Sequence, residues 1–314
     1  MLKRLITFIV MVILSGTSFS EEDFPNRPIT LLIGFEQGGT LFTQANTLAD
    51  ILSEKLGQPV NLETRAGYGG GTAAAMLANS NSEGYILLFT PSFPLTDYPA
   101  RLQVSYKIDD FSYIAAISAD QHAFVTSQWA PFDDWASFLN YARQQHEIRY
   151  ASQNLTDRLI IQEIAEKEGF KVRIIPVSGG AGMAPLVLSG DVDLAFSGGT
   201  HSRYTDSGEM RVLAATGRDR LKHYPETPSL SELGYDVGMQ SVRLIAAPKN
   251  TPAYQLDILT SAVKEVILSP DFIHITEEVI RQPISFLQVD ELREFLLLQE
   301  QQLKELLKNK TIDP

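Results

Sequence analysis

The sequence predicts an α/β protein built from two units, each a mainly parallel β-sheet flanked by helices. Short apolar runs alternate with segments of helical spacing along most of the chain, and strands that alternate with helices are typical of a parallel sheet. Four of the apolar runs also end in a glycine cluster, and helix-like sequence follows at least three of them. These runs and their clusters are 29–35 with 38–40, 60–62 with 67–72, 172–177 with 178–182, and 192–196 with 197–200.

The first part of the chain predicts the first unit. Residues 29–33 are apolar throughout most of their length and predict a buried strand, and residues 43–56 carry apolar side chains at helical spacing before a glycine. A second strand is expected at 60–63, a helix at 73–78 and a third strand at 85–89. The resulting order, strand-helix-strand-helix-strand, favours a parallel sheet.

The middle of the chain repeats this alternation and predicts a second unit. Its apolar runs again alternate with segments of helical spacing. Strands are expected at 113–117, before this unit, and at 122–126, 172–177, 192–196 and 210–216. The expected helices are 132–145 and 159–169.

The last part of the chain predicts one more strand and two helices. The strand is expected at 243–247, and the helices at 252–268 and 290–308. The final helix is amphipathic, and its leucines and Phe295 form one apolar stripe. We interpret this stripe as a contact with the core of the protein rather than a dimer seam, and we expect a monomer.

The N-terminal residues 1–20 predict a cleavable signal peptide. Lys3 and Arg4 precede an apolar stretch at 5–14, which is too short to span a membrane, and Ser18-Phe19-Ser20 is a small-x-small cleavage pattern. The mature chain should therefore begin near Glu21. A membrane anchor is the alternative interpretation, but a lipoprotein is excluded because no Cys stands at the cleavage position.

Composition narrows the function classes. The net charge is −12 over 314 residues, and it becomes −14 without Lys3 and Arg4 because residues 1–20 contain no acids. Such an acidic protein is a poor partner for nucleic acid or for an anionic membrane surface. The chain has no Cys, which excludes thiolate metal sites and Cys nucleophiles and fits an oxidising compartment without reliance on disulfides.

The glycine clusters themselves predict a binding site. Glycine lets backbone N–H groups approach a ligand, and the first turn of a helix has free N–H donors and a positive dipole end. Several such loops facing one cleft would bind a small anion without any catalytic side chain. The alternative for each single loop is an ordinary strand-to-helix turn.

Several motifs, in this order and spacing, are similar to those of one protein family. They are 24–29, Leu56-Gly57-Gln58-Pro59-Val60, 64–70, 83–88, Tyr150-Ala151-Ser152, 179–181, 190–194, 225–229, and Ala247-Pro248 with Thr251-Pro252. Over nearly the whole mature chain, the sequence resembles the periplasmic substrate-binding receptors of the tripartite tricarboxylate transporters, often called Bug proteins.

The resemblance implies a two-domain clamshell with a ligand in the cleft between the domains. The chain would cross between domains twice, at the strands 122–126 and 241–247. Domain 1 would then consist of residues 21–122 and 243–314, and domain 2 of residues 123–242. Family ligands are typically carboxylates held by backbone amides, hydroxyls and waters, and the family's partners are membrane permease subunits.

The chain departs from the family pattern in the loops that the resemblance places at the ligand. The family's Gly-Gly-Gly-Thr-Asp is replaced by residues 38–42, Gly-Gly-Thr-Leu-Phe, and its glycine-rich loop after Ser152 is replaced by the shorter segment 153–158. Val177-Ser178 replaces a Tyr-Lys/Arg pair, and 196–200 replaces Phe-Asp-Asn. We infer that the fold is kept and that the ligand chemistry has changed or binding has weakened.

The glycine loops, read together with the resemblance, give the candidate ligand-binding residues. These are Gly38, Gly39, Thr40, Tyr68, Gly69, Gly70, Phe93, Ser152, Asn154, Thr156, Ser178, Gly179, Gly180, Thr200 and His201. Basic candidates for pairing with a carboxylate are Arg158, Arg203 and Arg243. Phe42 is expected to pack beneath its loop.

Three functions from different classes remain open on the sequence. The first is a periplasmic receptor that delivers a small organic acid to a tripartite transporter, and the second is a sensor read by a membrane signalling protein. The third is a secreted enzyme, but the chain has no Gly-x-Ser-x-Gly, His-Glu-x-x-His or P-loop motif. Its five histidines lack metal-ligand spacing. We therefore expect no enzyme activity, cofactor or metal.

Overall fold

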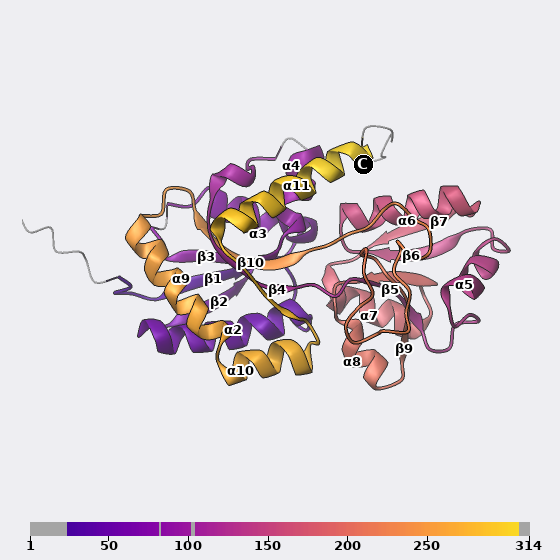
Figure 1. The fold of residues 1–314 in the computed structure, drawn as a ribbon, viewed down its shortest axis with the longest axis horizontal. Helices are drawn as coiled ribbons and strands as arrows, with labels where there is room; N and C mark the ends of the chain where they lie inside the picture. The colour runs from indigo at the N-terminus through magenta and orange to yellow at the C-terminus, as the bar shows by residue number, and fades with distance from the viewer. Residues whose placement is uncertain (1–23, 82, 102–103, 308–314) are drawn as a thin grey trace, which may run out of the picture.

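The computed structural model describes residues 24–81, 83–101 and 104–307, so the predicted signal peptide lies outside the described residues. Two β-sheets lie side by side along the long axis of the molecule, each flanked by helices (Figure 1). We call the six-stranded sheet with its helices the first lobe, and the five-stranded sheet with its helices the second lobe.

The first lobe contains a mixed sheet in the order β11-β4-β10-β3-β1-β2. Strand β1 is parallel to β2 and β3, whereas β10 is antiparallel to β3 and β4, and β11 is antiparallel to β4. In chain order the strands are β1 (Ile29–Ile33), β2 (Val60–Thr64), β3 (Ile86–Pro91), β4 (Phe111–Ala119), β10 (Val242–Pro248) and β11 (Ile284–Leu287).

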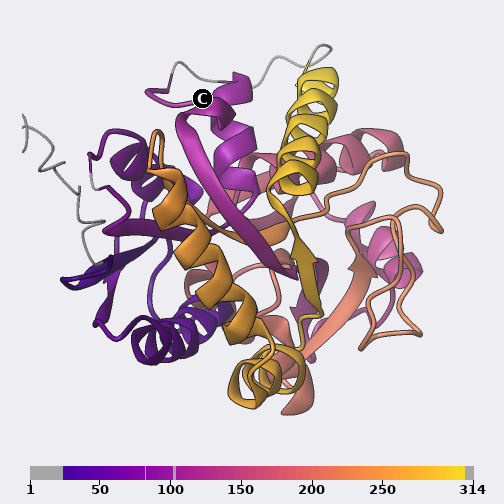
Figure 2. The ribbon, with the colours of Figure 1, turned by 60° about the vertical axis from the view of Figure 1, so that its left-hand side comes forward.

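Helices cover both faces of this sheet. Successive side chains of a strand point to opposite faces, and the strands carry apolar side chains on both faces. Leu31 packs in one core cluster with α2 and α9, while its neighbour Leu32 packs in another with α3 and α11. Figures 1 and 2 show these two pairs of helices on opposite sides of the sheet. The helices are α2 (Thr40–Leu56), α3 (Gly71–Ala78), α4 (Phe93–Arg101), α9 (Ala253–Ile267), α10 (Pro270–Ile273) and α11 (Val289–Leu307). Short turns of other helix types are η1 (Tyr68–Gly70), η2 (Ile108–Asp110) and η3 (His274–Val279).

The second lobe contains a sheet in the order β7-β6-β8-β5-β9, in which β5 alone runs antiparallel to its neighbours. Helices α5 and α6 share a core cluster on one face, and α7 packs on the other. The strands are β5 (Ala123–Ser127), β6 (Ile148–Ser152), β7 (Val172–Pro176), β8 (Leu194–Ser197) and β9 (Met210–Ala215). The helices are α5 (Trp135–Ala142), α6 (Leu155–Glu168), α7 (Gly179–Ser189) and α8 (His201–Asp206).

The chain passes between the two sheets twice, from β4 to β5 through residues 120–122 and from β9 to β10 through residues 216–241. The strand that enters each sheet after a crossing, β5 or β10, runs antiparallel to both of its neighbours. Each sheet is therefore mainly, but not wholly, unidirectional. The domain boundaries at 122/123 and 242/243 stay a prediction.

The expected strands and helices are present. Some helices begin at other residues than expected, because an N-cap residue fixes their first turn. The helix expected at 159–169 begins earlier, as α6, because the side chain of Asn154 accepts from the N–H of Asp157 at 2.9 Å. The helix expected at 132–145 is the shorter α5, capped by Asp134 through Ser137 N–H at 2.7 Å. The stripe of the last helix faces the core, where Leu292 and Leu296 are fully buried.

Some elements lack a sequence signal. Helix α4 contains Pro99 in its interior, and proline normally argues against helix. Helix α8 has six residues and strand β11 has four. Both are too short to show the helical or the strand periodicity of apolar residues. Strand β6, with its buried Tyr150, lies where the sequence shows only a family motif.

A close backbone contact at the end of β1 gives a test of the fold. A Cβ on Gly34 would lie 2.5 Å from Cα of Gly70 and 2.9 Å from its carbonyl oxygen, so β1 and the η1 loop would have to separate. We expect Gly34→Ala to lower the free energy of unfolding by about 1–3 kcal/mol, as overpacking of a rigid site does. Urea unfolding measures this change. Gly217→Ala is the control, because its nearest atom would be 3.7 Å away; equal urea midpoints for the two variants would contradict the expectation.

Candidate binding site between the two lobes

A small cavity lies between the lobes and is lined by both of them and by the first crossing. Its volume is about 40 Å³, which is room for about three water molecules. The first lobe contributes Phe35, Glu36, Gly39, Thr40, Leu41, Pro91, Phe93 and Arg243. The second contributes Gln153, Ser178, Gly179, Gly180, Ala181, Phe196, Gly198 and Thr200, and the crossing contributes Asp120 and His122.

Two helix N-termini reach this cavity, one from each lobe. Gly39 is the N-cap of α2 and Ser178 is the N-cap of α7, and neither makes a side-chain cap hydrogen bond. The first N–H groups of both helices are therefore without side-chain partners, and the positive dipole ends point toward the same space. This arrangement favours an anion.

The second of these N-termini depends on a residue without a side chain. A Cβ on Gly180 would lie 1.9 Å from Oγ1 of Thr200, so only glycine lets the start of α7 approach the loop after β8 this closely. The approach brings the hydroxyl of Thr200 and the N–H groups of α7 to one wall of the cavity.

A buried ion pair forms the floor of the cavity. Arg243 is 2% exposed, and its Nε donates to Oδ1 of Asp120 at 2.8 Å. Its Nη1 donates to Oε1 of Gln44 at 2.9 Å and its Nη2 to Oγ1 of Thr40 at 2.7 Å. The guanidinium thus joins β10, the first crossing and the start of α2.

Asp120 is held by two further side-chain donors, Ser241 and Gln282. Ser241 donates to its Oδ2 at 2.7 Å, and Nε2 of Gln282 donates to its Oδ1 at 3.1 Å and to the carbonyl of Gly198 at 3.0 Å. Burial alone would raise the pKa of Asp120, but the charge of Arg243 and the polar neighbours outweigh it and lower that pKa to about 2. The carboxylate therefore stays charged at neutral pH.

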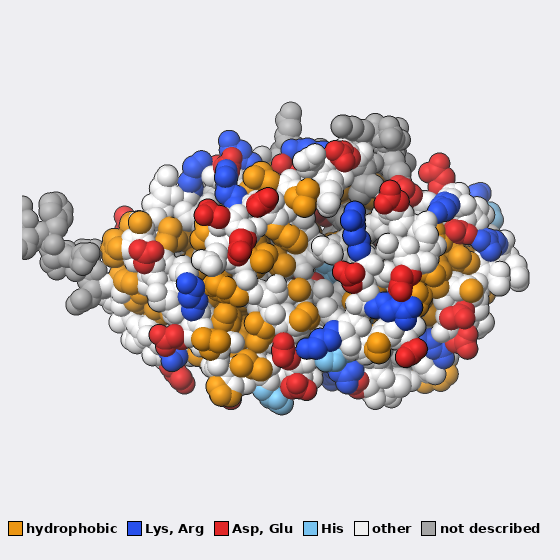
Figure 3. All heavy atoms as spheres, viewed as in Figure 1, with side chains coloured by type: hydrophobic (Ala, Val, Ile, Leu, Met, Phe, Trp, Pro, Cys, Tyr) orange, Lys and Arg blue, Asp and Glu red, His pale blue; other side chains and the backbone are white. Residues whose placement is uncertain are grey.

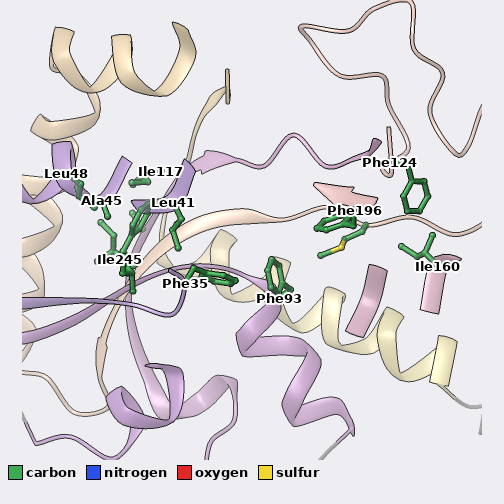
Figure 4. Close-up of a cluster of buried hydrophobic side chains, with 14 of the residues drawn as sticks. Phe35, Leu41, Ala45, Leu48, Phe93, Ile117, Phe124, Ile160, Phe196 and Ile245 are labelled. Carbon is green, nitrogen blue, oxygen red and sulfur yellow. The ribbon is translucent and has the colours of Figure 1, made fainter. Parts of the chain in front are cut away.

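A row of rings crosses the cavity from lobe to lobe. The ring centroids of Phe35 and Phe93 are 5.9 Å apart, those of Phe93 and His122 are 6.5 Å apart, and those of His122 and Phe196 are 4.9 Å apart. Figure 4 shows Phe35, Phe93 and Phe196 in succession between the sheets. These rings therefore give the cavity one aromatic wall.

The lobes also meet away from the cavity, where α4 faces the start of α6. Oδ2 of Asp97 accepts from Oγ1 of Thr156 at 2.8 Å and from its N–H at 3.3 Å. Burial, opposed by these hydrogen bonds, raises the pKa of Asp97 to about 7, and burial raises the pKa of Asp157 to about 7 as well. Two carboxyl groups thus approach each other from opposite lobes.

The fifteen predicted ligand-binding residues fall into two groups. Those that line the cavity are Gly39, Thr40, Phe93, Ser178, Gly179, Gly180 and Thr200. Those outside its lining are Gly38, Tyr68, Gly69, Gly70, Ser152, Asn154, Thr156 and His201. That any of the fifteen binds a ligand stays a prediction.

The residues outside the lining have other positions in the fold. Tyr68 is 79% exposed, whereas Ser152 donates to the carbonyl of Asn154, the residue that caps α6. His201 is buried with its Nδ1 3.0 Å from Oγ of Ser197. Burial, with the nearby charges of His122 and Arg281, lowers the pKa of His201 to about 3, so its ring is neutral.

Of the three basic candidates, one lines the cavity and two do not. Arg243 lines the cavity, whereas Arg203 is exposed with its guanidinium 5.7 Å from the centroid of the Tyr204 ring. Arg158 is half-buried and does not line the cavity. Phe42 packs against the core of the first lobe, as expected.

Sequence reasoning missed several residues of the cavity. They are Phe35, Asp120, His122, Gln153 and Phe196. Asp120 and His122 had one usable signal, since they interrupt two apolar strands and therefore mark the crossing between the lobes. The others are single side chains at strand ends, where no motif marks them.

A cavity between two α/β lobes that are joined by two crossings defines a solute-binding clamshell of the periplasmic-binding-protein type. The chain belongs to the tripartite tricarboxylate transporter family receptors, whose model matches residues 44–309. It is 28% identical over 261 residues to protein BugT of Bordetella pertussis, which covers 80% of this chain and 79% of that protein.

Solved structures share the fold. The periplasmic binding protein BugD matches with a TM-score of 0.83 and 22% identity, over 91% of this chain and 98% of that one. MatC from Rhodopseudomonas palustris with bound malate matches with a TM-score of 0.81 and 18% identity, over 90% of this chain and 99% of that one.

Among the residues that the structure describes, no helix combines the length and the apolar character that crossing a membrane requires. Within the same part of the chain, no group of three or more His, Asp or Glu side chains is placed to hold a metal ion. Acidic and basic side chains are interspersed over the face in Figure 3.

Proposed function

We propose that this protein is a periplasmic solute-binding receptor that captures a small organic acid in the cavity between its lobes and delivers it to the permease of a tripartite tricarboxylate-type transporter. The observation that carries the proposal is the convergence of two uncapped helix N-termini, α2 and α7, on one cavity with Arg243 in its floor. Membership of the receptor family and the malate bound by MatC support an acid as the ligand. Residues 1–20, as a signal peptide, would direct the chain to the periplasm.

Capture requires the lobes to open and close. We propose that domain 1 (21–122 and 243–314) and domain 2 (123–242) turn about the crossings at 120–122 and 216–241, which is a hinge motion. Closure would bring the start of α7 against the start of α2 and exclude water from the acid. The permease would then recognise the closed form.

Binding of an acid should raise the thermal stability of the mature protein, which begins at Glu21. At one hundred times the dissociation constant, a ligand stabilises the native state by about 2.7 kcal/mol. Thermal unfolding, after bound ligand has been removed by unfolding and refolding, would be measured with mono-, di- and tricarboxylates. Neutral sugars and amines are the controls, and a shift with these but with no acid would refute the proposal.

A further inference from the structure

His122 is a buried polar side chain that lacks a hydrogen-bond partner among the described residues. It is 3% exposed and lines the cavity from the first crossing. Its Nε2 lies 3.4 Å from Oδ2 of Asp120 without hydrogen-bond geometry, and its Nδ1 has no partner. Buried polar atoms are nearly always hydrogen-bonded, so a ligand that bonds this ring would satisfy an otherwise unpaired group.

The imidazole lies among apolar rings. Phe93 and Phe196 flank it, and Phe35 continues the row toward the first lobe. A ligand that reaches His122 therefore places the rest of its body against aromatic carbon. Such a wall favours an apolar body over a second polar group, because an unpaired polar group is costly to bury.

The charged side chains around the cavity disfavour a second negative charge on the ligand. Among the described residues of the lining, the acidic side chains are Glu36 and Asp120, and the one Arg or Lys is Arg243. Arg243 is already matched by Asp120, and each of its three guanidinium nitrogens donates to the protein. One carboxylate can take the donors of α7 and His122, but a second would find no free basic side chain in this lining.

We propose that His122 is the residue that determines ligand specificity, and that the cavity selects a compact monocarboxylate with an apolar body over dicarboxylates and tricarboxylates. This inference rests on the proposed receptor function. The carboxylate bonds His122 and the start of α7, near Ser178, and the apolar body lies against Phe93 and Phe196. The small volume of the cavity, about 40 Å³, favours a short body.

Matched pairs of acids test the class of ligand by isothermal titration calorimetry. Butyrate is compared with succinate, and crotonate with fumarate, because each pair differs by one carboxylate at equal chain length. We expect each monocarboxylate to bind about tenfold or more tightly than its partner, since a buried unpaired charge is strongly disfavoured. Equal or tighter binding of the dicarboxylates would overturn the inference and leave the proposed function standing. Binding of no acid at all would overturn the proposed function itself.

Variants test the role of the imidazole. His122→Leu should weaken binding of the monocarboxylate by about tenfold or more, whereas His122→Gln, which keeps a donor, should retain most of the affinity. His274→Leu, at an exposed histidine outside the cavity, is the matched control. Thermal unfolding without ligand identifies any variant that fails to fold. If His122→Leu does not fold, the affinity of His122→Gln is compared with that of the wild type. Wild-type affinity in a folded His122→Leu protein would overturn the assignment.

Discussion

Replacement of Arg243 by methionine should lower the free energy of unfolding by about 3–5 kcal/mol, the usual cost of removing one partner of a buried ion pair. The cost arises because Asp120, 2% exposed at its side chain, would stay buried without its countercharge. The substitution also leaves Gln44 and Thr40 without the guanidinium that joins them to β10. We therefore expect the start of α2, and any acid bound there, to lose order together with stability.

Urea or thermal unfolding of the single and double variants would measure this effect. The double variant Arg243→Met with Asp120→Leu should recover much of the loss, because an apolar pair of similar volume removes both charges. Arg220→Met is the control, since Arg220 pairs with Glu232 at the surface, where both side chains are about 44–45% exposed. If Arg220→Met and Arg243→Met lowered the free energy of unfolding equally, the buried ion pair would contribute no more to stability than the surface pair.

The same ion pair shows what local sequence can and cannot predict. The apolar runs and glycine clusters predicted the strands and the loops at their ends, because period and turn chemistry are local properties. Asp120 and Arg243 are 123 positions apart, and Thr40 is 203 positions from Arg243. No periodic pattern links such distant residues, so their meeting depends on how the two crossings orient the lobes.

The residues of the candidate site were likewise predicted where local sequence marks them and missed where the approach of the lobes decides their place. Gly39 and Ser178 were predicted because each follows a strand and begins a helix, and parallel strands bring such loops to one edge of a sheet. His122 and Phe196 were missed because their place in the cavity follows from the approach of one lobe to the other. Tyr68 was predicted from its glycine neighbours, yet its side chain points to solvent.

Asp97, which accepts hydrogen bonds from Thr156 of the other lobe, should make the free energy of unfolding depend on pH. The pKa of Asp97 is raised from 3.8 to about 7, so the native state binds a proton that the unfolded chain has lost. Stability from this group is fully present below pH 3.8 and is lost as the pH rises to about 7. A shift of about three pH units corresponds to about 4 kcal/mol at most. The raised pKa of Asp157 acts in the same direction, and the two carboxyls titrate as a coupled pair.

Comparison of Asp97→Asn with the wild type isolates this contribution from others. His201, whose pKa is lowered from 6.5 to about 3, opposes it between those values, but His201 is the same in both proteins. Asparagine keeps an oxygen that accepts from Thr156 and has no charge to bury, so the variant should equal the wild type near pH 4. It should become progressively more stable than the wild type up to pH 7, and the difference should then stay constant.

Urea unfolding at half-unit intervals from pH 4 to pH 8.5 would give the two curves, with Asp50→Asn as a control at an exposed position of α2. Because Asp97 and Thr156 belong to different lobes, the same titration also bears on closure, since opening would return Asp97 to water and to its ordinary pKa. Mild acid should therefore favour the closed form as well as the folded one. A difference between Asp97→Asn and the wild type that is flat over the whole range would show that Asp97 keeps its charge in the native state, and the contact between α4 and α6 would then be an ordinary charged hydrogen bond.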